Sequence, residues 1–287
     1  MKIGFNFSLG TTYPLVTQLV RERAIDFCEI LIDNFLQVPA VELAAAFDCP
    51  VAFHIMFSKY MESDQAALED LAARLREYID ILRPLYVSDH IAAFSHLGRH
   101  LYHLAEVDYA GAYRQIRERT LWWQERLGCR VHLENYPSIM DGGHDAPAFF
   151  ARLTKETGCG LLFDISNAVC AQRNCGLPLD AWSPLAAEAR HFHIAGFTGS
   201  ILSPRLAIDA HDTDLAPDTL AYLERIGPAL ALPGRTLTYE RDGNIEYEAI
   251  VRDLHRLRTA LACPKPSHGH AAVNAGASED RNANVTA

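Results

Sequence analysis

Histidine and acidic residues recur near the carboxyl ends of successive apolar segments. In chain order they are His54 in AFHIM, His90 in YVSDH, Glu134 in HLENY, Asp164 in LLFDIS, His193 in HFHIA and Glu240 in LTYER. Taken alone, a histidine in an apolar strand is more often a hydrogen-bonded core residue than a metal ligand. Six consecutive segments that each carry such a residue are less easily explained as core residues. Buried charges at this density need partners, and metal ions are common partners of buried histidines and carboxylates.

The residue types narrow the choice of metal. Imidazoles mixed with carboxylates, with no cysteine at these segment ends, suit Zn(II), Fe(II) or Mn(II). Asn167 follows Asp164 by three residues, and Asp209 and His211 follow the seventh segment. Together these donors exceed what one ion needs. We therefore expect two or three ions that share a bridging carboxylate.

Eight strand-like segments have to position these residues. They are residues 3–7, 27–33, 50–57, 85–92, 130–136, 160–166, 191–197 and 235–242, with helical patterns between them. Strands that alternate with helices predict parallel βαβ units. Eight units favour a (β/α)8 TIM barrel, whose active site lies at the carboxyl ends of the strands. A doubly wound open sheet is the alternative, but no GxGxxG motif follows the first strand.

Length and composition set further limits. The chain has 287 residues, and we expect one catalytic barrel domain over residues 1–262 with a disordered tail over 263–287. The net charge of −10 argues against a nucleic-acid partner. No apolar run is long enough for a membrane span, and the amino-terminal segment lacks signal-peptide features. Seven cysteines without a CxxC pair fit a reduced, cytoplasmic protein.

The order of the candidate ligands loosely resembles that of the three-metal abasic-site endonucleases and the xylose-isomerase-like barrels. The chain departs from the endonuclease pattern at Asn167, where that family has a histidine. Its acidity also fits poorly with binding DNA.

A closer resemblance covers residues 1 to about 260. The stretches FHIMFS, YVSDH, LENYPSIM, LLFDISNAVCAQRNCG, HFHIAG and TYERD resemble the multinuclear non-haem iron enzymes that modify cysteine in ribosomally made peptides. This family includes the MbnB enzymes of methanobactin biosynthesis and the TglH enzymes of 3-thiaglutamate biosynthesis. HIMFSKYMESD and SNAVCAQRNCGLPLD are more similar to the TglH branch.

The resemblance implies a ligand assignment. The first iron would be held by His54, His90 and Glu134, the second by the bridging Glu134 with Asp164, His193 and Glu240, and a third, weaker position by Asn167, Asp209 and His211. Asparagine is a weak neutral ligand, so the third ion would exchange more readily.

The resemblance also implies an activity. Two or three irons in a mixed Fe(II)/Fe(III) state would use O2 to oxidise the carboxyl-terminal cysteine of a peptide. In the TglH branch the cysteine β-carbon leaves as formate and the sulfur rejoins the α-carbon. Oxazolone and thioamide formation, as in methanobactin, is the alternative. A separate small protein would bind the leader region of the peptide.

Five further residues are candidates for roles around the metals. Asp242 lies two residues from Glu240 on the same strand face and is predicted as an acid/base residue or as a partner of a ligand. Arg173 is predicted to bind a substrate carboxylate, since its guanidinium can hold one with two hydrogen bonds. Asn174, Tyr136 and Ser138 are predicted to line the peptide entrance.

Three other classes remain open from the residues alone. A metal-dependent hydrolase or endonuclease would favour zinc and need no O2. A sugar isomerase would act on a small polyol with two divalent ions. A non-enzymatic metal-binding protein would have closed coordination with no open position.

Overall fold

A computed structural model describes residues 1–201, 206–230 and 232–262. Eight parallel strands form a closed barrel in the order β1-β12-β9-β8-β7-β4-β3-β2. Their bounds are β1 Lys2–Phe7, β2 Phe27–Leu31, β3 Val51–His54, β4 Val87–His90, β7 Val131–Glu134, β8 Gly160–Asp164, β9 His191–Ala195 and β12 Thr236–Glu240. The predicted TIM barrel is confirmed, and each strand lies within its predicted segment except β1, which begins one residue earlier.

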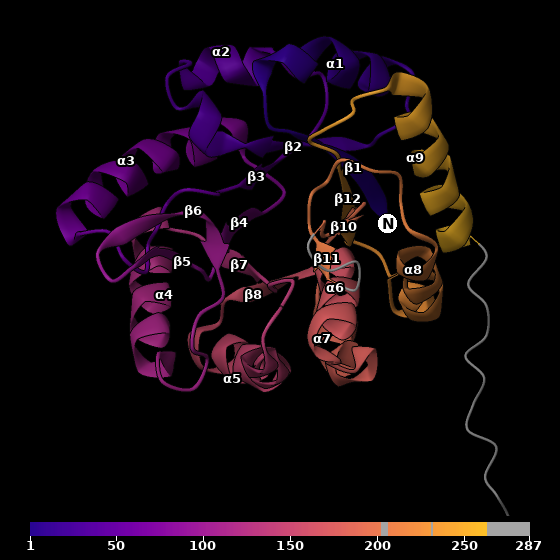
Figure 1. The fold of residues 1–287 in the computed structure, drawn as a ribbon. Helices are drawn as coiled ribbons and strands as arrows, with labels where there is room; N and C mark the ends of the chain where they lie inside the picture. Colours follow the sequence, from indigo (N-terminus) through magenta and orange to yellow (C-terminus); the bar gives the residue numbers. More distant parts are fainter. Residues whose placement is uncertain (202–205, 231, 263–287) are drawn as a thin grey trace, which may run out of the picture.

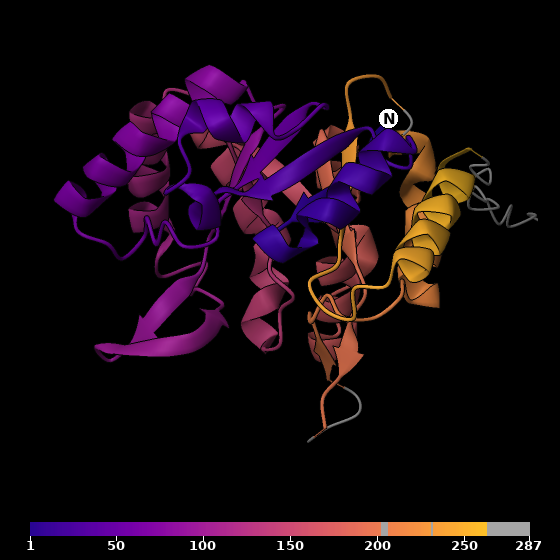
Figure 2. The same cartoon turned by 90° about the horizontal axis from the view of Figure 1, so that it is seen from above.

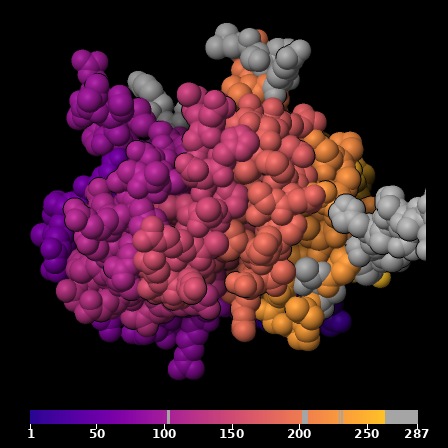
Figure 3. Space-filling model, turned by 90° about the horizontal axis from the view of Figure 1, so that it is seen from below, coloured from indigo at the N-terminus to yellow at the C-terminus, as the bar shows by residue number. Residues whose placement is uncertain are grey.

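Helices surround the strands (Figure 1). They are α1 Tyr13–Arg21, α2 Ala40–Ala45, α3 Gln65–Leu82, α4 Tyr113–Leu127, α5 Ala146–Thr157, α6 Ile165–Cys175, α7 Ser183–Glu188, α8 Pro217–Leu230 and α9 Tyr247–Ala262. Short 3-10 turns lie at Gly10–Thr12, Ile32–Phe35, Asp141–Asp145 and Leu179–Trp182. From below, α4, α5 and α7 form a continuous outer surface (Figure 3).

The helix ends follow from local sequence. The side chain of Asp64 accepts a hydrogen bond from the backbone N–H of Ala67 and caps α3. Three other helices end at a glycine with positive φ: α4 at Gly128, α5 at Gly158 and α6 at Gly176. Glycine adopts this left-handed conformation without steric cost, so each helix stops where its strand must begin or its loop must turn.

The barrel register sets the height of the polar side chains. His90 pairs with Glu134 across β4 and β7, and Asp164 pairs with His193 across β8 and β9. Because side chains alternate between the two faces of a strand, these residues share the inner face. At the opposite end of the barrel the ring of His132 fills the space beside Gly160, where a Cβ would lie 2.0 Å from the imidazole.

Two antiparallel hairpins interrupt the βα pattern and were not predicted. The first consists of β5 Ala93–His96 and β6 Arg99–Ala105, and the second of β10 Thr198–Gly199 and β11 Ala207–Ile208. Both project from the same side of the barrel (Figure 2). They belong to loops that follow β4 and β9, which is the side where barrel strands end.

The first and last strands close the barrel. β1 pairs with β12, and Asn6 links them further by accepting a hydrogen bond from the backbone N–H of Arg241 and donating one to Asp242.

No helix in the described ranges is long and apolar enough to cross a membrane. The predicted tail over residues 263–287 lies outside the described residues.

Candidate metal centre

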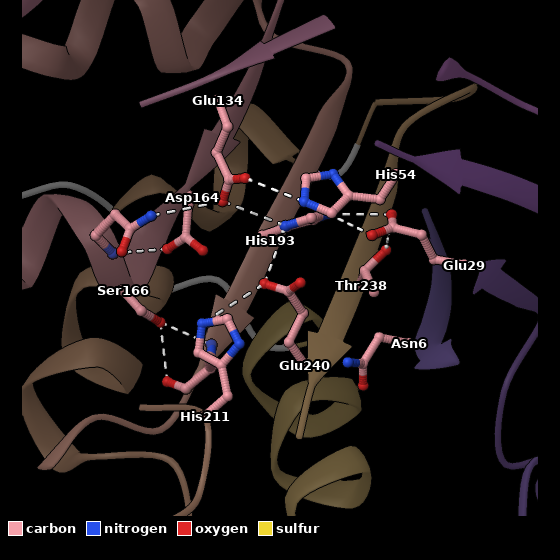
Figure 4. Close-up of polar contacts among 12 residues, drawn as sticks. Asn6, Glu29, His54, Glu134, Asp164, Ser166, His193, His211, Thr238 and Glu240 are labelled. Atoms are coloured by element: carbon pink, nitrogen blue, oxygen red, sulfur yellow. Dashed lines mark hydrogen bonds and ion pairs between the residues drawn. The ribbon is translucent and has the colours of Figure 1, made fainter. Parts of the chain in front are cut away.

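Six predicted ligands meet inside the carboxyl end of the barrel. Figure 4 shows them, apart from His90. His54, His90, Glu134, Asp164 and Glu240 are the last residues of their strands, and His193 is the middle residue of β9. All are buried except His90, which is partly exposed. The closed barrel therefore converts six distant sequence positions into one cluster.

Glu134 lies between a pair of histidines and a third histidine. Its Oε2 is 3.6 Å from Nε2 of His54 and 3.0 Å from Nε2 of His90. Its Oε1 is 3.4 Å from Nδ1 of His193. The two oxygens therefore face different groups of donors, which is the arrangement of a bridging carboxylate.

The donor atoms form adjoining sets with metal-site spacing. One set contains His54, His90 and Glu134, and another contains Glu134, Asp164, His193 and Glu240; within each set the donor atoms lie within 4.8 Å of one another. These are the groups that the sequence resemblance assigned to the first and second ions.

The predicted third position is assembled only in part. Nε2 of His211 is 2.8 Å from Asp209 and 4.0 Å from Glu240. Asn167 instead donates to the backbone oxygen of Asn135 at 3.0 Å and lies 3.5 Å from Glu134. Asn167 thus lies beside the carboxylate of Glu134, and His211 lies near Glu240. An ion shared by Asn167, Asp209 and His211 stays a prediction.

The burial of unpaired polar atoms tests whether these residues fit metal ions. Asp164 Oδ2 and Asn167 Oδ1 are buried and have no hydrogen-bond partner. Native proteins pair almost all such atoms, because an unpaired buried polar group costs about 1–3 kcal/mol. Metal ions would satisfy these two oxygens and would separate the charges of the adjoining histidines and carboxylates, so the residues fit.

The pKa shifts of Asp164 and His193 show the same demand for positive charge. Burial, together with Glu134, Asp209 and Glu240, raises the pKa of Asp164 well above its usual value. Burial opposes the charged form of His193, yet Glu240, Glu29 and Glu134 raise its pKa well above the usual value. Burial and the neighbouring His90 hold the pKa of His54 well below its usual value, so this imidazole is neutral and ready to coordinate.

Asp242 contacts a histidine of the predicted third position. Its Oδ2 is 3.0 Å from Nδ1 of His211, while its Oδ1 accepts hydrogen bonds from Asn6 and Ser8 at 2.8 Å each. Arg241 pairs with Asp214 and not with Asp242. Asp242 therefore orients the His211 ring, and its predicted acid/base role stays a prediction.

The four predicted peptide-contacting residues already have protein partners. Tyr136 and Ser138 lie on the loop after β7, whereas Arg173 and Asn174 belong to the last turn of α6 and not to a loop. Arg173 pairs with Asp218 at 2.7 Å, and both amide atoms of Asn174 bond to the backbone of β11. The hydroxyl of Tyr136 donates to the backbone of Leu104, and that of Ser138 donates to Glu106. The contacts of Asn174, Tyr136 and Ser138 brace the two hairpins, and that of Arg173 joins α6 to α8. Substrate binding by these residues remains a prediction.

The sequence reasoning missed Glu29 of β2. This carboxylate is 1% exposed and lies 2.8 Å from Nε2 of His193. Its signal was present in the sequence, as the one acidic residue in the apolar stretch FCEIL. It was overlooked because it lies in the middle of a strand, while the search examined the strand ends.

A closed parallel barrel with a histidine and carboxylate cluster at its carboxyl mouth defines a xylose-isomerase-like TIM barrel with a candidate metal centre. Solved structures agree with this fold. The 3-keto-D-glucoside 4-epimerase YcjR of E. coli superposes with a TM-score of 0.56 at 16% identity, over 90% of this chain and 99% of that one. A xylose isomerase domain protein of Planctomyces limnophilus gives 0.54 at 15%, over 91% and 95%.

Sequence comparison gives the family. Residues 6–262 match the family described as RiPP precursor modification enzyme MbnB/TglH/ChrH, and this chain belongs to it. RiPPs are ribosomally made peptides that are modified after synthesis. Among its relatives are UPF0276 proteins of Rhizorhabdus wittichii, 31% identical over 77% of this chain and 81% of the relative, and of Acaryochloris marina, 28% identical over 75% and 81%.

Proposed function

We propose that this enzyme is an O2-dependent, multinuclear iron oxidase that excises the β-carbon of the carboxyl-terminal cysteine of a ribosomally made peptide. The observation that carries the proposal is the pair of adjoining donor sets that share Glu134. Membership of a family of peptide-modifying enzymes supports the substrate class.

The residues divide the work of holding the metals. His54, His90 and Glu134 would hold one ion, and Glu134 with Asp164, His193 and Glu240 would hold its neighbour. Bound iron would supply the one-electron chemistry with O2 that amino-acid side chains lack. The carboxylates provide negative charge that favours the higher oxidation state, and the burial of the donors keeps bulk water away from the reacting cysteine.

The donor types support iron over a structural zinc site. All the members of the two sets are histidines and carboxylates, and no described cysteine belongs to either. Carboxylate-rich sites with open positions suit Fe(II), whereas closed structural zinc sites rely on cysteine. A substrate thiolate could then supply the missing sulfur ligand when the peptide binds.

Exposed apolar side chains around the barrel mouth support a peptide substrate. Loops that follow barrel strands carry large exposed hydrophobic residues: Leu9, Phe57, Leu97, Ile139, Met140 and Ile201. Such a surface is unusual for an enzyme of small polar sugars and typical of contact with another chain. We propose that the peptide and a small leader-binding protein dock on this surface.

Two further parts of the proposal follow from the sequence. The net charge of −10 favours a function without nucleic acid, and we place the enzyme in the cytoplasm.

Metal analysis of anaerobically purified protein is the first test. We expect two to three irons in the wild type and fewer in His54→Ala and Asp164→Ala. Asp253→Asn is the control, because Asp253 is buried like His54 and Asp164 but lies on α9 outside the barrel. Full zinc occupancy with no iron recoverable under reducing conditions would overturn the oxidase and favour a hydrolase.

The reaction itself is tested with a peptide that ends in cysteine labelled with ¹³C at the β-carbon. Excision predicts O2-dependent release of labelled formate and a peptide that lacks one CH2 unit. Retention of the label in an oxidised peptide would instead indicate oxazolone and thioamide formation. An unchanged peptide in the presence of O2, iron and the leader-binding partner would contradict both.

A further inference from the structure

The imidazole of His193 faces carboxylates through both of its nitrogens. Nδ1 is 3.0 Å from Glu240 and 3.4 Å from Glu134, on the side of the metal cluster. Nε2 is 2.8 Å from Oε1 and 3.0 Å from Oε2 of Glu29, on the opposite side. A neutral imidazole has one N–H donor and one lone pair, so the partner of one nitrogen decides what the other can do.

Glu29 is itself held in a fixed orientation. Its Oε2 accepts hydrogen bonds from the hydroxyl of Thr238 at 3.0 Å and from the hydroxyl of Tyr86. Both donors project from barrel strands or their edges, and Tyr86, Thr238 and Glu29 are buried. Among the described residues, Glu29 forms no ion pair with an arginine or lysine, and its ion-pair partner is His193. The carboxylate therefore serves this one imidazole.

The lower part of the barrel supports Tyr86 in turn. The ring of Tyr86 stacks on His191 at 4.2 Å between centroids, and His132 meets His191 edge-on at 4.5 Å. The Nδ1 of His191 is hydrogen-bonded to the hydroxyl of Thr236 at 2.9 Å. A packed column of rings thus runs from the lower barrel to Glu29, which leaves the carboxylate little room to turn away.

We propose that Glu29 is a positioning residue that accepts the Nε2–H of His193 and so directs the Nδ1 lone pair at the metal held with Glu134, Asp164 and Glu240. Histidine ligands commonly donate their second N–H to a carboxylate, which fixes the ring and its tautomer. This inference rests on the proposed metal-dependent function, but it concerns a residue outside the ligand assignment.

One alternative uses the same atoms differently. Glu29, His54 and His193 also lie close enough to hold an ion of their own. That ion would take the Nε2 lone pair and turn Nδ1 into a donor, which would remove His193 from the set with Glu240 and Glu134. The two arrangements are therefore mutually exclusive and predict different metal counts.

Glu29→Gln tests the proposal with cobalt(II) as the probe. The neutral amide is a weaker acceptor for Nε2–H, and its N–H groups oppose the hydroxyls of Tyr86 and Thr238. We expect about 10- to 100-fold weaker binding of one Co(II) in chelator competition, an altered visible spectrum, and the wild-type stoichiometry at saturation. Asp253→Asn should keep the wild-type affinity and spectrum, because its carboxylate bonds to Tyr239 and the backbone of Leu215.

Two results would overturn the inference. Unchanged Co(II) affinity and spectrum in Glu29→Gln would show that the contact does not orient His193. Loss of one equivalent that saturating Co(II) cannot restore would make Glu29 a ligand. If Glu29→Gln does not fold, Thr238→Val and Tyr86→Phe replace it, because each removes one hydrogen bond to Glu29. Each should weaken Co(II) binding by a smaller factor than Glu29→Gln. Wild-type Co(II) affinity in both variants would refute the proposal.

The outcome is separable from that of the proposed function. A wild-type protein that binds no divalent metal would contradict the proposed function before any variant is compared. A wild-type protein that binds metal but does not oxidise peptides would contradict the oxidase while leaving the result for Glu29 intact.

Discussion

Replacing Asp164 with asparagine should have opposite effects on the metal-free and metal-loaded protein. Asp164 is 0% exposed, and its Oδ1 caps α6 by accepting the backbone N–H of Asn167 at 2.6 Å. Asparagine caps a helix about as well as aspartate, so the cap survives in Asp164→Asn. The substitution removes a buried carboxyl group whose pKa is raised by burial and by three nearby carboxylates. Without metal, the variant should be as stable as the wild type or more stable at neutral pH.

The metal-loaded protein should show the reverse order. One ion at 100 to 1,000 times its Kd stabilises the folded state by about 2.7–4.1 kcal/mol. At roughly 2–4 °C per kcal/mol for a chain of this size, that corresponds to a rise in Tm of about 5–15 °C per ion. Loss of Asp164 removes a negatively charged ligand from the second donor set, so the rise in the variant should be less than half of that in the wild type.

Scanning calorimetry of chelator-treated and Fe(II)-loaded samples under anaerobic conditions measures all four states. Asp253→Asn again serves as the control. Its metal-free Tm should be lower than that of the wild type, but Fe(II) should raise its Tm by the same amount as in the wild type. The reasoning fails if metal-free Asp164→Asn is several degrees less stable than metal-free wild type and gains the same shift from Fe(II). Asp164 would then be a structural residue of α6 and not part of a metal site.

Three further predictions concern stability, pH dependence and substrate binding. Ser166→Ala should lower the free energy of unfolding by about 1–3 kcal/mol in urea titrations and leave the metal content unchanged, because the buried Ser166 hydroxyl bonds to both backbone groups of Ala195. Burial raises the pKa of Asp89 to about 7. Because this folded-state pKa exceeds the unfolded-state pKa, the metal-free protein should lose stability as the pH rises from about 4 to about 7. Asp89→Asn should flatten this dependence of stability on pH, even though the substitution lowers stability overall. Met140→Glu on the mouth should raise KM for the peptide about tenfold, a loss of roughly 1.4 kcal/mol. Val41→Glu on α2, where the side chain is similarly exposed, should leave KM unchanged, and equal effects of both would refute the docking surface.

The barrel was predictable because its strands carry a simple signal. Each strand is a short apolar run bounded by turn residues, and a helical pattern separates it from the next strand. The alternation of strands and helices can therefore be recognised from short stretches of sequence. The hairpin of β5 and β6 was not predicted because it lies between β4 and α4, where an alternation of strands and helices predicts only a connection. Leu97 and Gly98, both with positive φ, make its tight turn, and leucine is not a residue whose presence signals such a turn.

The metal cluster was predictable where ligands end their strands, since the barrel brings strand ends together. The position of Glu29 in an apolar strand was a visible signal, but its role was not predictable, because that role depends on His193, which is 164 residues away and approaches only when the barrel closes. The pairing of Arg173 with Asp218 was equally inaccessible, because nothing local shows which acidic residue of a later helix will reach it.

The separation of the ligands along the chain has a consequence for how the enzyme matures in the cell. Donors run from His54 on β3 to Glu240 on β12, and the seam that closes the barrel joins Asn6 to Asp242. A ribosome must release nearly the whole chain before Glu240 can join Glu134 and His193. Any metal ion shared by the two donor sets therefore enters a finished barrel after translation, because the second set is incomplete until β12 has joined β1 and β9.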